Sequence, residues 1–194
     1  GGLAGWSPMG FSNTGTFNSS IFTVRSSWTY AGVGGFSGSC LTTGPNGGAL
    51  GGGSENHYIV PVANNMVSPS ISPAGRGYTD LRLRFHSIKN GRDSAGARYR
   101  VHVGTWLSIG YAGWYQWTQV YDTTKAGTGK QVETVVINLG SAYVSASDLR
   151  IRFEFTDNNT CPTCPSGLIT HTVPYGEYAG WSVDNVVLEG RRPL

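Results

Sequence analysis

The sequence predicts an all-β protein, a two-sheet antiparallel β-sandwich of the jelly-roll type. Three observations lead to this prediction. Several segments alternate apolar and polar residues with the period of two that a half-buried strand requires, most clearly Leu149–Phe155. Glycine accounts for 29 of the 194 residues and separates these segments, as turns between many short strands require. No segment has a clear helical period.

The chain is expected to hold one domain. Residues 1–20 have weak periodicity and are predicted to be an irregular lead-in, whereas residues 21–194 are predicted to form a single jelly-roll domain. Its strands are expected, in order, at 21–28, 57–62, 67–71, 79–88, 97–103, 116–122, 132–139, 148–155, 170–174 and 180–189. Asn90-Gly91 predicts a hairpin-type turn between the strands at 79–88 and 97–103.

Composition and motifs exclude several classes of function. The net charge is only +3, which gives no basis for binding nucleic acid or an anionic membrane. No apolar run approaches the length of about 18 residues that a membrane span needs. The acidic residues are scattered, and neither a Gly-x-Ser-x-Gly elbow nor a His-Glu-x-x-His motif is present. We therefore expect a protein that is not an enzyme.

Arginines occupy the outward positions of three predicted strands: Arg82, Arg84, Arg98, Arg100, Arg150 and Arg152. If these strands adjoin, one sheet carries a basic face. That face would be either a solvated surface paired with acids such as Glu154, or a site that recognises an acidic glycan or a partner subunit.

The three cysteines leave their pairing open. Cys161 and Cys164 lie in one loop rich in Pro, Thr and Gly, and a disulfide between them would pin that loop. The alternatives are a disulfide from Cys40 to one of them and a zinc site with a further ligand such as His171. Any disulfide would imply an exported protein, because disulfides persist in oxidising surroundings.

A densely aromatic loop is predicted over residues 105–117. Trp117 is expected to begin a core strand, and the remaining rings can stack on the apolar faces of sugars. The alternative is plain packing or cross-strand pairing within a hairpin. The candidate ligand contacts are therefore Tyr111, Trp114 and Tyr115 in this loop, with Tyr175 and Tyr178 in a later loop as a second cluster.

Short motifs follow one another along the chain: Val67-Ser68-Pro69-Ser70-Ile71, Leu81-Arg82-Leu83-Arg84-Phe85, Gly104-Thr105-Trp106, and Gly180-Trp181-Ser182-Val183-Asp184-Asn185-Val186. Together they resemble MAM-like and galactose-binding-like jelly-roll modules of secreted bacterial or cell-surface proteins, including modules appended to peptidases. The resemblance implies a secreted or cell-surface location and makes Trp106 the buried tryptophan of a turn.

The same resemblance implies a structural Ca²⁺ near the join of the first and last strands. Asp184 is the ligand it would supply, with Glu189 as a second possibility, because Ca²⁺ takes oxygen ligands. Asp and Asn are poor strand formers, so the alternative reason for Asp184 is a hydrogen-bonded corner or bulge.

These observations lead us to expect a non-catalytic extracellular module for recognition or adhesion that binds cell-surface glycan. The alternative is a structural or assembly module, either a peptidase-appended domain or the tip of a trimeric fibre, that acts through contacts between proteins. A binding module leaves its aromatic loop exposed in a monomer, whereas an assembly module buries it against identical subunits.

Overall fold

The structure, a computed structural model, describes residues 7–8, 23–25, 40–42, 56–60, 62–91, 97–127, 129–157, 169–173 and 180–193. Every regular element in these ranges is a β-strand, and no described helix is long and apolar enough to cross a membrane. The strands are β1 (Ser7–Pro8), β2 (Thr23–Arg25), β3 (Cys40–Thr42), β4 (Asn56–Val60), β5 (Val62–Val67), β6 (Asp80–Asn90), β7 (Ala97–Ile109), β8 (Ala112–Thr123), β9 (Gln131–Gly140), β10 (Leu149–Asp157), β11 (Ile169–Val173) and β12 (Gly180–Arg191).

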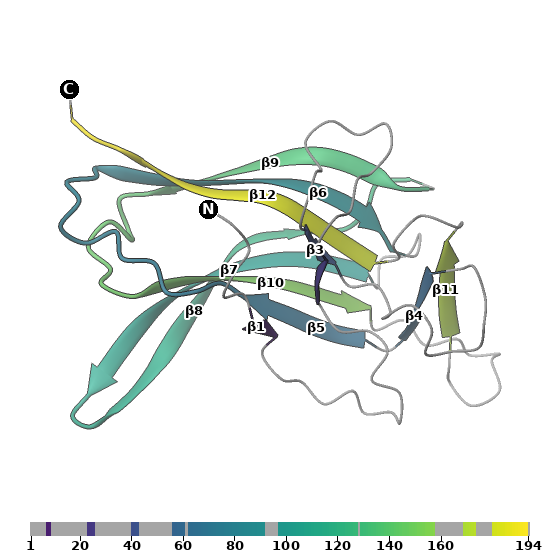
Figure 1. Cartoon of the computed structure of the whole chain (residues 1–194), viewed down its shortest axis with the longest axis horizontal. Coiled ribbons are helices and arrows are strands. Elements are labelled where there is room, and N and C mark those ends of the chain that lie inside the picture. Colours follow the sequence, from purple (N-terminus) through teal and green to yellow (C-terminus); the bar gives the residue numbers. More distant parts are fainter. Residues whose placement is uncertain are drawn as a thin grey trace.

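These strands form two packed antiparallel sheets (Figure 1). The order in the first sheet is β1-β5-β10-β7-β8, and the order in the second sheet is β2-β3-β12-β6-β9. The short strands β4 and β11 pair separately. In the predicted lead-in the structure describes residues 7–8, which form the short strand β1 and pair with β5.

The pairing of strands from opposite ends of the chain identifies the fold as a jelly roll. β3 pairs with β12, β5 with β10, β6 with β9 and β7 with β8, as in one long hairpin folded at β7–β8. Pairing of β12 with β6 and of β10 with β7 then rolls that hairpin into two sheets. The predicted all-β jelly roll is confirmed.

One apolar core lies between the two sheets, with Trp181 near its centre. The ring of Trp181 meets the rings of Phe85, Tyr99 and Phe153 edge-on at centroid distances of 6.3, 5.6 and 5.5 Å. Its indole N–H donates a hydrogen bond of 2.9 Å to Ser87 Oγ, which satisfies the polar atom of a fully buried ring. The apolar side chains of the alternating strands in both sheets thus point into one shared core.

The predicted hairpin between the strands at 79–88 and 97–103 is wrong. β6 continues through Lys89 and Asn90, and it belongs to a different sheet from β7. Lys89 is only 1% exposed, because its ammonium contacts Glu133 Oε1 at 2.5 Å and donates to Tyr121 Oη at 2.9 Å inside the sandwich. The chain crosses between the sheets after Asn90 and does not turn back beside itself.

The remaining boundary differences concern proline-containing segments. The prediction of a strand at 67–71 is wrong, because β5 ends at Val67 and Ile71 makes only an isolated bridge to Leu149. The strand expected at 57–62 is split between β4 and β5. Pro69 removes a ladder donor after Val67, which accounts for the end of β5 there.

Candidate functional site

The hairpin of β7 and β8 projects beyond the end of the sandwich (Figure 1). β10, the neighbour of β7, begins at Leu149 opposite Thr105, so Trp106–Ile109 pair only with β8 among the described strands. Gly110 and Tyr111 form the turn. Gly110 has a φ of 61°, a conformation that costs glycine little and that the tight turn of a hairpin requires.

The alternation of the two strands divides the hairpin side chains between two faces. The outer face of the sheet carries Gly104, Trp106, Ser108, Gly113, Tyr115 and Trp117. The core-side face carries Leu107, Ile109, Ala112 and Trp114. The predicted aromatic loop is therefore wrong as a loop, because its rings lie on two paired strands, with Trp106 opposite Tyr115. A role of these rings in contacting a ligand stays a prediction.

The three candidate contacts in this region do not share a surface. Tyr111 lies at the turn and is fully exposed, and Trp114 is 47% exposed on the core-side face opposite Leu107. Tyr115 is half-buried on the outer face, opposite Trp106. Tyr175 and Tyr178, the second candidate cluster, lie outside the described residues.

Trp106 is the ring that the sequence interpretation misplaced. It is 45% exposed on the outer face of the hairpin and is not the buried tryptophan of a turn. Its indole lies directly over Gly113, where an added Cβ would come within 2.1 Å of Cζ2 and 2.5 Å of Cε2. One face of the ring is thus held against the backbone. Gly113, which pairs with Ser108 and lies diagonally from Trp106 on the same face, was the sequence signal that could have identified this.

Tyr115 is fixed beside Trp106 by a network around Asp148. Its hydroxyl donates to Asp148 Oδ2 at 2.5 Å, and the hydroxyl of Ser70 donates to Oδ1 at 2.7 Å. The guanidinium of Arg150 lies 4.7 Å from the centre of the Tyr115 ring. Burial and the bond to Asp148 raise the pKa of Tyr115, so its hydroxyl remains a donor at neutral pH.

Trp117 lies deeper on the outer face and is covered. A Cβ at Gly104 would come within 2.7 Å of its ring, and the guanidinium of Arg152 lies 4.6 Å from its ring centre. It sits in the middle of β8 and is half-buried on the outer face, so the expectation that it begins a core strand is wrong. The outer face therefore presents Trp106 as its exposed ring.

The outward arginines do not form one basic face. Arg82 and Arg84 lie on β6, whereas the other four lie on β7 and β10 of the opposite sheet. Acids offset them: the ion pairs include Arg98–Asp122, Arg100–Glu154 and Arg82–Glu189. The expected pairing with acids is thus present, and every carboxylate whose side chain the structure describes has a partner. Recognition of an acidic glycan or a partner subunit by these arginines stays a prediction.

The two predicted calcium ligands lie apart on β12. Asp184 is buried opposite His86, and its Oδ1 accepts the backbone N–H of Asn185 at 2.7 Å. Asn185 has a φ of 50° and lies within the β-bulge that follows Asp184. This bulge is the alternative explanation for Asp184 that the sequence analysis gave. Glu189 is instead bound by Arg82 and Arg84.

Asp184 and Glu189 therefore do not form a shared cation site. Within the described ranges no three His, Cys, Asp or Glu side chains come close enough to hold a metal, and calcium at Asp184 stays a prediction. Cys161 and Cys164 lie outside the described residues, and Cys40 and His171 are described only as backbone in β3 and β11. The disulfide and zinc alternatives thus stay predictions.

Comparisons with known proteins give distant structural likenesses. No protein-family model and no curated protein sequence matches this chain. The K3 cleaved adhesin domain of Lys-gingipain from Porphyromonas gingivalis is 13% identical, with a TM-score of 0.48 over 95% of this chain and 91% of that one. A family 11 carbohydrate-binding module from Clostridium thermocellum, in complex with a β-1,3-1,4-mixed-linked tetrasaccharide, is also 13% identical with a TM-score of 0.48, over 100% and 93% of the two chains.

A third solved structure is similarly distant. The family 11 module of the cellulosomal cellulase Lic26A-Cel5E of Clostridium thermocellum is 12% identical, with a TM-score of 0.44 over 100% of this chain and 92% of that one. At such distances the fold assignment depends on the strand order of this chain itself, and the residues of its hairpin must carry any argument about function.

Proposed function

We propose that this chain is a non-catalytic recognition module, exported or displayed at a cell surface, that binds saccharide through the outer face of the β7–β8 hairpin. The observation that carries the proposal is the position of Trp106. The ring projects beyond the sandwich, is 45% exposed, and has one face held against Gly113. The exposed part of this ring is apolar surface that a ligand can cover, and its removal from water would favour binding.

The chemistry of the surroundings suits a sugar. The apolar C–H face of a pyranose stacks on an indole, and its hydroxyls need donors and acceptors nearby. Arg150 and Asp148 lie beside Tyr115, whose ring is 5.1 Å from that of Trp106, and Ser108 adds a hydroxyl on the same face. Because Gly113 and Tyr115 fix the indole before binding, little side-chain entropy is lost when a ligand stacks on it.

The test is a glycan array on the purified chain, followed by calorimetry with the best ligand. Trp106→Ala should lower the affinity at least about tenfold, whereas Trp114→Ala, a matched loss of a ring on the opposite face, should change it little. Loss of binding in Trp114→Ala alone would move the ligand to the core-side face with Tyr111. Unchanged affinity in Trp106→Ala, or no glycan bound at all, would contradict the proposal.

The core-side face of the hairpin favours a second candidate, assembly through contacts between proteins. Leu107, Ile109 and Trp114 are 39, 70 and 47% exposed on this one face. An apolar surface of this kind is typical of a protein interface. If identical chains meet there, the mass in solution should be that of a trimer or another closed oligomer, and Ile109→Ser should reduce it to that of a monomer. A monomeric wild-type chain would exclude self-assembly.

A further inference from the structure

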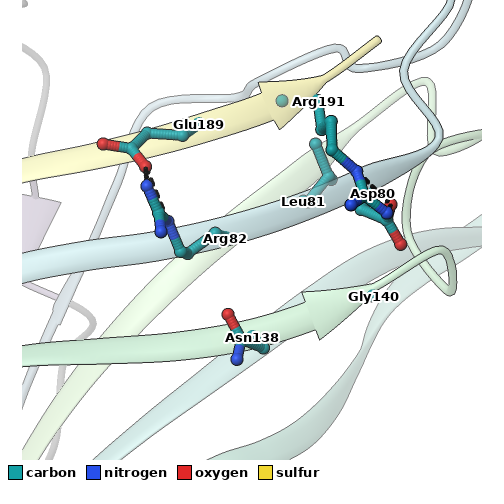
Figure 2. Close-up of a pocket in the computed structure, with 8 residues that line it drawn as sticks. Asp80, Leu81, Arg82, Asn138, Gly140, Glu189 and Arg191 are labelled. Carbon is teal, nitrogen blue, oxygen red and sulfur yellow. Dashed lines mark hydrogen bonds and ion pairs between the residues drawn. The ribbon is translucent and has the colours of Figure 1, made fainter. Parts of the chain in front are cut away.

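A hollow of about 540 Å³ lies at the far end of the second sheet, where β6 begins and β9 and β12 end (Figure 2). The residues around it are far apart in sequence, and the jelly-roll pairing of β6 with both neighbours brings them together. Its volume lies in the range of about 300–1,000 Å³ that is usual for sites of small ligands. It is on the sheet opposite to the one that carries the β7–β8 hairpin.

Two ion pairs between β6 and β12 line the hollow. Arg82 Nε donates to Glu189 Oε2 at 2.7 Å, and Arg191 Nε donates to Asp80 Oδ2 at 2.9 Å (Figure 2). The two arginines remain 54 and 77% exposed, so N–H groups that are not used in these pairs can reach a ligand. The four charges cancel, and the lining offers donors and acceptors side by side without a net charge.

Asn138 on β9 completes the lining from the other side. It lies opposite Arg82 in the ladder, is exposed, and makes no side-chain hydrogen bond with any described residue. Figure 2 shows it across Arg82 from Glu189. Asparagine is disfavoured in strands, and the other outward positions of this part of β9 are Thr134 and Val136, which are good strand formers. The Asn138 amide is therefore accessible to a ligand in the hollow.

We propose that this hollow binds a neutral polyhydroxylated ligand, namely a single saccharide unit. The Asn138 amide can donate to one sugar hydroxyl and accept from the next, while the carboxylates accept and the guanidiniums donate. A charged ligand would meet as many like charges as opposite ones, so a neutral one is favoured. This site is separate from the hairpin and goes beyond the function proposed above.

The experiment is a residue-resolved NMR titration of the full chain with a panel of common neutral monosaccharides, up to about 100 mM because a single sugar unit binds weakly. Glucuronate and sulfate serve as charged comparators. At least one neutral sugar should shift the amide signals of residues 80–82, 138–140 and 189–191 in a saturable way. Asn138→Ala should weaken that binding about tenfold, the effect of about one hydrogen bond between neutral groups. Thr134→Ala, on the same strand and face but outside the hollow, should leave it unchanged.

Three results would overturn the proposal: no saturable shift at these amides with any sugar of the panel, equal affinity in Asn138→Ala, or tighter binding of glucuronate or sulfate. Saturable shifts confined to the hairpin residues 104–117 would also overturn it, yet would support the proposed function. Saturable shifts confined to the residues of the hollow would support this proposal and contradict saccharide binding by the hairpin. The outcome for the hollow and the outcome for the hairpin can therefore be distinguished.

Discussion

Adding one methyl group at Gly113 should disable the Trp106 surface without weakening the fold. The new Cβ would lie 2.1 Å from Cζ2 of the indole. Carbon atoms in contact are normally at least about 3.5 Å apart, so the ring must move by at least about 1.4 Å. The moved ring is no longer held against the backbone, and its free face no longer has a fixed direction.

The effect on stability should have the opposite sign. Gly113 does not have a positive φ, so alanine fits its backbone conformation. Glycine in a strand interior costs about 0.5–1 kcal/mol relative to alanine, and Trp106 is too exposed to contribute much to the core. We therefore expect the free energy of unfolding of Gly113→Ala to equal or exceed that of the wild type, within about 1 kcal/mol, while saccharide affinity falls at least about tenfold.

Urea denaturation measures the free energy of unfolding, and calorimetry with the ligand from the array measures the saccharide affinity. Near-ultraviolet circular dichroism detects the displacement of the Trp106 ring in the absence of a ligand. Gly104→Ala is the matched control. Its Cβ would press on Trp117, which is half-buried beneath Arg152, so this change should lower stability. An unchanged dichroism spectrum and unchanged affinity in Gly113→Ala would refute the reasoning.

Two predictions concern charged groups within and on the sandwich. Glu133→Gln should lower the free energy of unfolding by about 3 kcal/mol, because it leaves the buried Lys89 ammonium without its counter-ion. Adding Lys89→Met should recover most of the loss in urea denaturation, and a loss below about 1 kcal/mol in Glu133→Gln would mean that Lys89 reaches water. The hydrogen bond from Arg98 lowers the pKa of Asp122, so the stability from this pair is present above about pH 4 and is lost as the pH falls through the lowered pKa. Asp122→Asn should therefore reduce the acid dependence of the thermal midpoint, and an unaltered pH profile would contradict this assignment.

The fold class could be predicted because its signals are local. In β10 the buried positions Leu149, Ile151 and Phe153 alternate with outward arginines, as the period of two requires. The pairing of strands, in contrast, depends on residues that are far apart in the sequence. Asn90-Gly91 has the chemistry of a hairpin turn, yet the following strand crosses to the other sheet, and Lys89 is buried by Glu133 and Tyr121 from distant strands.

The candidate site could be located from the sequence but not oriented. The cluster of rings at 105–117 was visible, whereas the face of each ring depends on the register that the turn at Gly110 and Tyr111 sets. A slip of one residue would exchange the faces of Trp114 and Tyr115. The hollow on the second sheet could not be found at all, because Asp80, Asn138 and Glu189 meet only through the jelly-roll topology.

The boundary between core and hairpin on β7 explains how one strand serves two purposes. Up to Val103 its inward side chains are covered by the opposite sheet, and Tyr99, Val101 and Val103 are 0% exposed. Beyond Thr105 the same side of the strand carries Leu107 and Ile109, which are exposed. Side chains past that point bury too little area to stabilise the fold, so selection for packing does not account for an apolar and aromatic composition there. The two functions proposed for the hairpin would account for that composition. Because Trp106 and Trp114 lie on opposite faces, substituting each ring separately distinguishes saccharide binding from contact with a protein.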